Sequence, residues 1–144
     1  MGTPYETVYS RFLTYISDYE FLLLDGDSLN STLLELLDLA VTDFEICRQD
    51  LSSRDDAALQ FETNLTPKEI EILSIAMACH WLQPKVMNAD NLRNVLNTKD
   101  YTAFSPAKLL EQMIALLGVM DKKFLREMNT YSYRNGDVGS MGAT

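Results

Sequence analysis

The chain has 144 residues, with 12 basic and 21 acidic side chains and a formal net charge of −9. This length fits one ordinary domain and is too short for a (β/α)₈ barrel, which needs about 250 residues. The apolar content of 47% supports a packed core and argues against wholesale disorder. The acidic balance disfavours a protein that binds nucleic acid by neutralising its phosphates.

The acidic charge is concentrated in one half of the chain. Residues 1–72 carry 15 acids and 4 bases, a balance of −11, whereas residues 73–144 carry 6 acids and 8 bases, a balance of +2. In a self-assembling protein such a dipole can orient one copy against the next, and in a monomer it serves only solubility. Both interpretations stay open at this point.

The sequence predicts neither a secretory signal nor a membrane span. No basic stretch precedes an apolar run at the N-terminus, and the uncharged stretch around residues 72–83 is far shorter than the about 20 residues that a span needs. The two cysteines, Cys47 and Cys79, do not make a disulfide framework and suit a reducing compartment. We therefore expect a protein that is made and kept in a cytosol.

Three segments carry the same type of helix-start signal. The sequences TPYE at residues 3–6 and TPKE at residues 66–69 offer a capping Thr, a Pro at the first helical position and a Glu three residues after the cap. Ser105 and Pro106 repeat the cap and the Pro without the Glu. The hydroxyl can accept an otherwise unpaired backbone N–H, and the Pro loses nothing because its position needs no N–H.

The first two helices are predicted over residues 4–17 and 29–49, separated by a break at the sequence DGD of residues 25–27. The apolar stripe of the first consists of Tyr5, Val8, Tyr9, Phe12, Ile16 and Tyr19. That of the second consists of Leu33, Leu36, Leu37, Ala40, Phe44 and Cys47, widened by Leu34, Val41 and Ile46. The wide second stripe predicts contact on two sides, with neighbouring helices or with another subunit.

Residues 50–65 are polar and predict a loop, with one short helical turn near residues 55–59 and with Leu51, Leu59 and Phe61 as apolar anchors. The third helix, over residues 67–82, is apolar nearly all round and is therefore expected at the centre of the fold. Pro84 is expected to end or kink it, because Pro lacks the N–H that a helix interior needs.

A short fourth helix is predicted over residues 89–96, a loop over residues 97–104, and a long last helix over residues 106–129. Residues 130–144 have no helical period and predict an extended, flexible tail. The expected fold is an all-α bundle of four to five helices in one domain, residues 1–129, followed by that tail. The core positions expected in the last helix are Leu110, Met113, Leu117, Met120, Phe124 and Met128.

No constellation of residues predicts catalysis, a cofactor or a metal. Cys79 and the only histidine, His80, are adjacent on a helix and point different ways, so they cannot converge on zinc. The sequence DGDSLN at residues 25–30 lacks the ligand and Gly positions of a calcium loop, and no Gly-rich phosphate loop occurs. We expect His80 in a core or interface, Asp55 and Asp56 in a polar loop, and no enzymatic activity. Lys122, Lys123 and Arg126 are interpreted as a solvated helix face.

The C-terminal tail is the sharpest candidate for a binding segment. Its aromatic start is unlike a plain linker, and such a segment could dock on a partner and become ordered there. A terminus with no role is the competing interpretation and stays open. The candidate docking residues are Tyr131, Tyr133, Arg134, Val138 and Met141.

The sequence also resembles the small helical head–tail connector (adaptor) proteins of tailed bacteriophages that infect Gram-positive bacteria. The resemblance spans about residues 4–133. It is carried by PYE at residues 4–6 with Tyr9, RFL at 11–13, FEICRQDLSSRDD at 44–56, LTPKEIEIL at 65–73, WLQP at 81–84 and TKDY at 98–101.

The resemblance implies a virion structural protein without catalytic residues. It implies a homo-oligomeric ring, commonly of twelve subunits, in the neck beneath the portal protein, reached from the host cytoplasm. The ring would extend the DNA channel and give a stopper or tail-completion protein a platform, and the tail would reach the portal or a neighbouring subunit. The acidic half of the chain would suit a channel wall that packaged DNA passes without specific binding.

Two other functions remain open on the sequence. One is a tail-completion or head-closure protein of the same neck region. The other belongs to a different class, an acidic helical regulator that sequesters a host protein, and its support is the net charge of −9.

Overall fold

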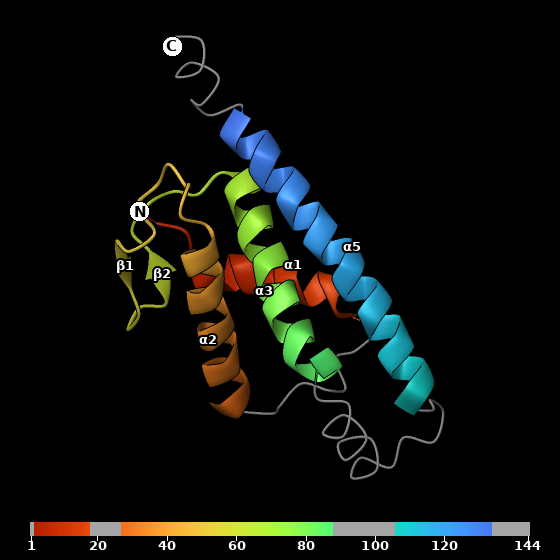
Figure 1. Ribbon diagram of the computed structural model, residues 1–144. Helices are drawn as coiled ribbons and strands as arrows, with labels where there is room; N and C mark the ends of the chain where they lie inside the picture. The colour runs from red at the N-terminus through yellow and green to blue at the C-terminus, as the bar shows by residue number, and fades with distance from the viewer. Residues whose placement is uncertain (1, 18–26, 88–105, 134–144) are drawn as a thin grey trace.

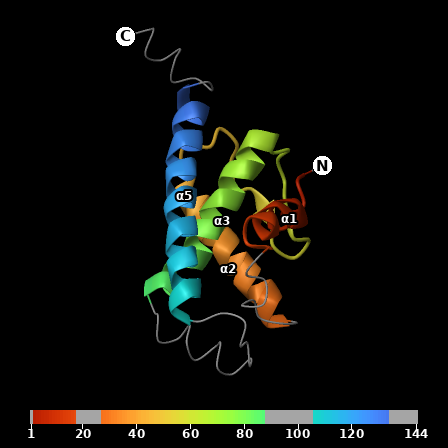
Figure 2. The same cartoon turned by 90° about the vertical axis from the view of Figure 1, so that its right-hand side faces the viewer.

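The computed structural model describes residues 2–17, 27–87 and 106–133. This part of the chain contains four helices and one short hairpin: α1 (Tyr5–Tyr15), α2 (Asp27–Asp43), β1 (Arg54–Asp55), β2 (Gln60–Phe61), α3 (Pro67–Met87) and α5 (Pro106–Ser132). Helix α3 lies in the middle, and α1, α2 and α5 each pack against it (Figure 1 and Figure 2). The predicted all-α bundle is therefore confirmed.

Helix α3 is central because its sequence offers apolar side chains in every direction. From Ile72 to Leu82 every side chain except His80 is buried. The buried hydroxyl of Ser74 donates to the Ile70 carbonyl oxygen at 2.7 Å, so this polar group needs no water. The position expected for the third helix is confirmed.

The start of α3 agrees with the prediction, whereas its end does not. At the start, Thr66 and Glu69 form the predicted capping box: Glu69 N donates to Thr66 Oγ1 at 3.2 Å, and Thr66 N donates to Glu69 Oε1 at 2.8 Å. At the other end the predicted boundary at residue 82 is wrong, because the helix passes Pro84 and continues to Met87. Pro84 is exposed and lies in the last turn, where water can reach the carbonyl that it leaves unpaired.

The TPYE segment at residues 3–6 does not form a capping box. Helix α1 runs from Tyr5 to Tyr15, one residue later and two residues shorter at its end than the predicted range 4–17. Its N-cap residue is Pro4, and no side chain caps it. Thr3 Oγ1 instead accepts a hydrogen bond from Leu65 N at 2.9 Å, and the Thr3 carbonyl oxygen accepts one from Phe61 N at 2.8 Å. The residue predicted as a cap therefore joins the N-terminal segment to β2 and to the approach to α3.

The predicted helical turn near residues 55–59 is wrong, because this segment closes a β-hairpin. Strands β1 and β2 pair antiparallel, with Asp55 opposite Gln60. Asp55 Oδ1 accepts hydrogen bonds from the backbone N–H groups of residues 57 and 58, and Leu59 has a φ of 56°. Leu59 is 48% exposed and is not the expected anchor, whereas Leu51 and Phe61 are buried as predicted.

Helix α2 ends at Asp43, six residues before the predicted end at residue 49. In a longer helix the Arg48 N–H would bond to the Phe44 carbonyl. Instead it donates to the hydroxyl of Tyr131 at 2.8 Å, and residues 44–47 form a turn in which Cys47 N bonds to the Phe44 carbonyl oxygen at 3.2 Å. A contact from the far end of the chain therefore replaces the last predicted turns.

Helix α5 begins at Pro106 as predicted and ends at Ser132, so residues 130–132 belong to the helix and not to an extended tail. The boundary expected at residue 129 is therefore wrong. Met113 and Met120 are buried as predicted, and Leu109 is fully buried whereas Leu110 is only partly so. The helix predicted over residues 89–96, the loop over 97–104, and the positions of Tyr19 and Ser105 lie outside the described residues.

Candidate interaction surfaces

The described part of the chain holds no group of three or more His, Cys, Asp or Glu side chains that could bind a metal ion. Within the same residues no helix is both long enough and apolar enough to cross a membrane. The residues that remain to be placed are the lone histidine, the two cysteines and the predicted docking residues.

His80 joins two helices. Its Nε2 lies 2.5 Å from Oδ2 of Asp43, at the end of α2, and the imidazole side chain is only partly exposed. The neighbouring thiol of Cys79 is buried, and burial, followed by its hydrogen bond with Asp121, raises its pKa to about 12. The thiol therefore stays protonated and is no nucleophile for an imidazole base. The arrangement ties α3 to α2, as expected for a core or interface histidine.

Cys47 lines an open cavity of about 380 Å³ at the end of α2. Burial raises the pKa of this thiol to about 11, so it too stays protonated near neutral pH. The charged residues around the cavity are of both signs, Arg48 with Glu45 and Asp50. The cavity therefore offers no activated nucleophile and no single-sign ligand site.

The predicted docking residues separate into three groups. Tyr131 is 2% exposed and packs edge-on against Phe44, with the ring centroids 5.0 Å apart, so it is part of the core and the docking prediction for it is wrong. Tyr133 is 63% exposed and remains a candidate. Arg134, Val138 and Met141 lie outside the described residues.

Tyr131 closes a buried hydrogen-bond network between three elements. Its hydroxyl accepts from Arg48 N at 2.8 Å and donates to Glu69 Oε2 at 2.7 Å, while Glu69 Oε1 accepts from Thr66 N. The Cys47 thiol also donates to Glu69 Oε2, at 3.6 Å. Burial, with the hydrogen bond to Glu69, raises the pKa of Tyr131. The network fixes the end of α5 to the start of α3 and to the turn after α2.

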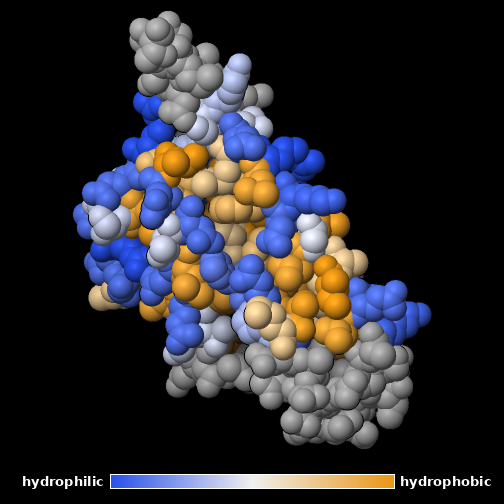
Figure 3. All heavy atoms as spheres, in the orientation of Figure 1, coloured by the Kyte–Doolittle hydropathy of each residue, from blue (hydrophilic) through white to orange (hydrophobic). Residues whose placement is uncertain are grey.

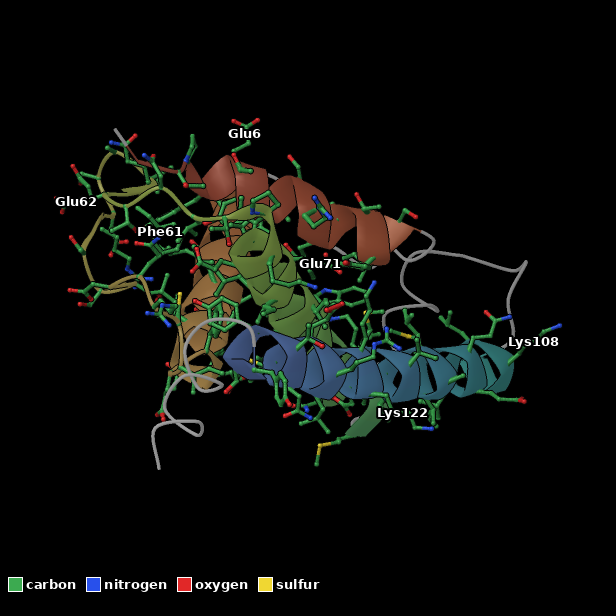
Figure 4. All side chains as sticks on the ribbon, turned by 90° about the horizontal axis from the view of Figure 1, so that it is seen from above. Glu6, Phe61, Glu62, Glu71, Lys108 and Lys122 are labelled. Atoms are coloured by element: carbon green, nitrogen blue, oxygen red, sulfur yellow. The ribbon has the colours of Figure 1, made fainter. Side chains whose placement is uncertain are left out.

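One candidate interaction surface is the outer face of α5, which consists of Ile114, Gly118, Val119, Lys122, Leu125 and Arg126. All six residues are exposed, and the three large apolar side chains, Ile114, Val119 and Leu125, are 50%, 58% and 62% exposed. Figure 3 shows hydrophobic residues gathered along the part of the molecule where α5 lies, and Figure 4 shows Lys122 directed away from the other helices.

Three further large apolar side chains are exposed elsewhere: Leu39 on α2, Ile46 in the turn that follows α2, and Leu59 in the hairpin, each 45–48% exposed. They come from three separate segments, and the guanidinium of Arg54 in the hairpin contacts Asp38, which lies on a different side of α2 from Leu39.

Sequence reasoning did not single out the outer face of α5. The signal was present in α5, because Ile114, Val119 and Leu125 are apolar and do not lie on the predicted core stripe. The sequence predicted only one part of the buried network. Glu69 was expected to cap the third helix, but its hydrogen bond to Tyr131 spans 62 positions of sequence and was not predicted. Lys123, predicted as solvated, instead lies 3.7 Å from Glu71 and over the ring of Tyr15.

Comparison of the chain with protein-family models, with curated proteins and with solved structures finds no match. The function is therefore argued from the outer face of α5 and from the resemblance described above.

Proposed function

We propose that this protein is a virion structural protein, a head–tail connector (adaptor) that forms a ring beneath the portal of a tailed bacteriophage. In this role it extends the DNA channel and provides a platform for a stopper or tail-completion protein. The proposal rests on the sequence resemblance together with one structural observation, the unpartnered outer face of α5. Its site of action would be the neck of the virion.

The outer face of α5 carries the proposal because it exposes three large apolar side chains, Ile114, Val119 and Leu125, along the longest described helix. Single exposed apolar residues are normal on any protein, but several on one helix face among charged residues are typical of an interaction site. His80, Cys47 and Cys79 each hold α3 to a neighbouring segment of the described chain.

The fold also suits a rigid ring subunit. Three helices are fixed to α3, and the Tyr131 network fixes the last turn of α5. The described part of the chain ends beside that fixed turn, at the exposed Tyr133. A docking segment that starts from a rigid point needs to order only itself on binding, which reduces the entropy cost of attachment.

Binding to the portal tests the proposal. The full chain is mixed with the portal protein from the same genome, and the complex is isolated by size exclusion and imaged by cryo-electron microscopy. We expect a ring of this protein seated on the portal, with free chain at low concentration remaining monomeric by light scattering. A chain that fails to bind the portal but binds the tail-side neck protein would indicate the head-closure alternative. Failure to bind either one would overturn the proposal.

Deletion of residues 135–144 tests the part of the proposal that concerns the tail. We expect the helical domain to keep its circular dichroism spectrum and its unfolding midpoint, because its described core lies before residue 134. Attachment to the portal should weaken by at least tenfold. Attachment equal to that of the full chain would contradict a docking role for the tail.

A further inference from the structure

Leu59 adopts a backbone conformation that costs stability. Its φ of 56° lies in the left-handed region, and within the described part of the chain no other residue except glycine has a positive φ. The Cβ of an ordinary residue lies too close to the next carbonyl oxygen in this region, which Gly, Asn and Asp adopt more readily. The strain of a left-handed leucine raises the unfolding equilibrium constant about fivefold or more.

The fold uses the backbone of Leu59 but not its side chain. The Leu59 carbonyl oxygen accepts a hydrogen bond from Tyr5 N at 2.9 Å, a bond that any residue at position 59 could make. The side chain is 48% exposed and does not belong to the core cluster. A strained conformation that the fold does not need points to a function of the side chain. For an exposed apolar side chain, that function is contact with another molecule.

The hairpin tip, residues 55–59, presents this side chain from a fixed backbone. Asp55 Oδ1 accepts hydrogen bonds from the backbone N–H groups of residues 57 and 58, at 2.9 and 3.1 Å. The Tyr5 hydroxyl donates to Asp56 Oδ1 at 2.6 Å, which ties the tip to α1. Because the backbone is already held in place, docking has to order little besides the leucine side chain, and this reduces the entropy cost of binding.

The surroundings of Leu59 are acidic. Residues 54–62 carry three acids and one base, a balance of −2. The base, Arg54, is already engaged by Asp38 of α2 and by Asp56. The two alanines that precede Leu59 are exposed. The tip therefore presents one large apolar side chain among small residues and carboxylates, which fits an apolar pocket edged by Lys or Arg.

We propose that the hairpin tip docks on the tail-side neck protein (the stopper or tail-completion protein), with Leu59 inserted into an apolar pocket edged by cations. The inference rests on the proposed function, because it names the part of each ring subunit that forms the platform. A net charge of −9 opposes contact between this acidic tip and a second copy of the chain. The hairpin and α5 lie on different sides of the bundle (Figure 1 and Figure 2), so the tip stays free while the outer face of α5 is occupied.

Leu59→Asn separates binding from folding, because Asn adopts the left-handed region readily but supplies no apolar anchor. The full chain, free and bound to the portal, is titrated with the tail-side neck protein from the same genome. Affinity should fall by about tenfold or more in Leu59→Asn. Leu59→Met keeps a large apolar side chain and should retain most of the affinity. Equal affinity of Leu59→Asn and the wild type would overturn the proposal.

Leu39→Asn is the matched control. Leu39 is 46% exposed, close to the value for Leu59, but it lies within α2, where its replacement relieves no strain. Affinity should therefore be unchanged in Leu39→Asn, whereas its unfolding equilibrium constant in urea should exceed that of Leu59→Asn by about fivefold or more. Equal unfolding constants for the two variants would show that Leu59 is not strained and would overturn the reason for assigning it to binding.

The outcomes distinguish the inference from the proposed function. Weaker binding of Leu59→Asn to the tail-side neck protein, with portal binding unchanged, supports the inference. Wild-type chain that binds the portal but not the tail-side neck protein overturns the inference alone. Weaker binding of Leu59→Asn to the portal only would assign the tip to a different partner and overturn the inference as well. Wild-type chain that binds neither protein overturns both the inference and the proposed function.

Discussion

The inner and outer faces of α5 show two uses of one helix. Tyr131 and Tyr133 are two residues apart, which turns them to nearly opposite sides of the helix, and they are 2% and 63% exposed. On the inner side the polar groups meet partners from α3: Tyr131 meets Glu69, and Glu127 Oε2 lies 2.6 Å from Lys68 Nζ. On the outer side Gly118 and its neighbours face open space. Inner-face changes should therefore alter folding, and outer-face changes should alter association.

Tyr131→Ala is the change with the largest expected effect. It removes a buried aromatic ring and leaves the Glu69 carboxylate without one of its donors, so we expect a loss of about 3–4 kcal/mol in the free energy of unfolding. Urea denaturation followed by circular dichroism measures this loss. Tyr133→Ala is the matched control on the opposite side of the helix. Similar losses for both variants would contradict the separation of the two faces.

The sequence predicted the parts of the fold that local signals determine. The TPKE box at residues 66–69 forms as expected because both partners lie within one helical turn. The same signal at residues 3–6 does not form a box, because Thr3 finds a partner in Leu65, far along the chain. A motif therefore predicted the start of a helix in both places but the partner of its hydroxyl in only one.

The errors have the same cause. The early end of α2 depends on the Arg48 N–H bonding to Tyr131, 83 positions away, and periodicity within a helix contains no information on such a contact. The Tyr131 prediction failed for the same reason, because an aromatic residue near a terminus is consistent with a tail and with a core. For the outer face of α5, the sequence contained the residues but not their exposure.

Tyr131→Phe isolates the hydroxyl from the ring. The aromatic contact with Phe44 is kept, whereas the hydrogen bonds to Arg48 and Glu69 are lost, so we expect a loss of about 1–2 kcal/mol. Chemical denaturation of the two proteins at pH 7 gives the difference. No loss would indicate that water replaces the hydroxyl without cost.

The pH dependence of stability provides a second measure of the same hydroxyl. The pKa of Tyr131 is raised in the folded protein, so above the unfolded value of about 10 the unfolded chain loses the proton first. The stability of the wild type should therefore be fully present below about pH 10 and fall as the pH rises above it. The Tyr131→Phe variant should show a shallower fall, because the other raised groups are common to both proteins. Parallel curves would contradict this contribution.

Gly118→Ala is expected to act in the opposite direction. Replacing an exposed glycine in the middle of a helix should raise the free energy of unfolding by about 0.5–1 kcal/mol, because the space around its Cβ is open. Thermal and urea unfolding at a concentration where the chain is monomeric provide the measurement. Destabilisation would show that residue 118 contacts something within the subunit.

Tyr133→Ala has the smallest expected effect on folding and the most direct bearing on function. Tyr133 is the exposed one of the two tyrosines predicted for docking, so its removal should change the free energy of unfolding by less than about 0.5 kcal/mol. If the ring docks on a partner, affinity for the portal should fall by about tenfold or more, since buried aromatic anchors carry much of the energy of such contacts. Unchanged affinity would restrict docking to residues after 133, and a large loss of stability would place Tyr133 with Tyr131 in the fold.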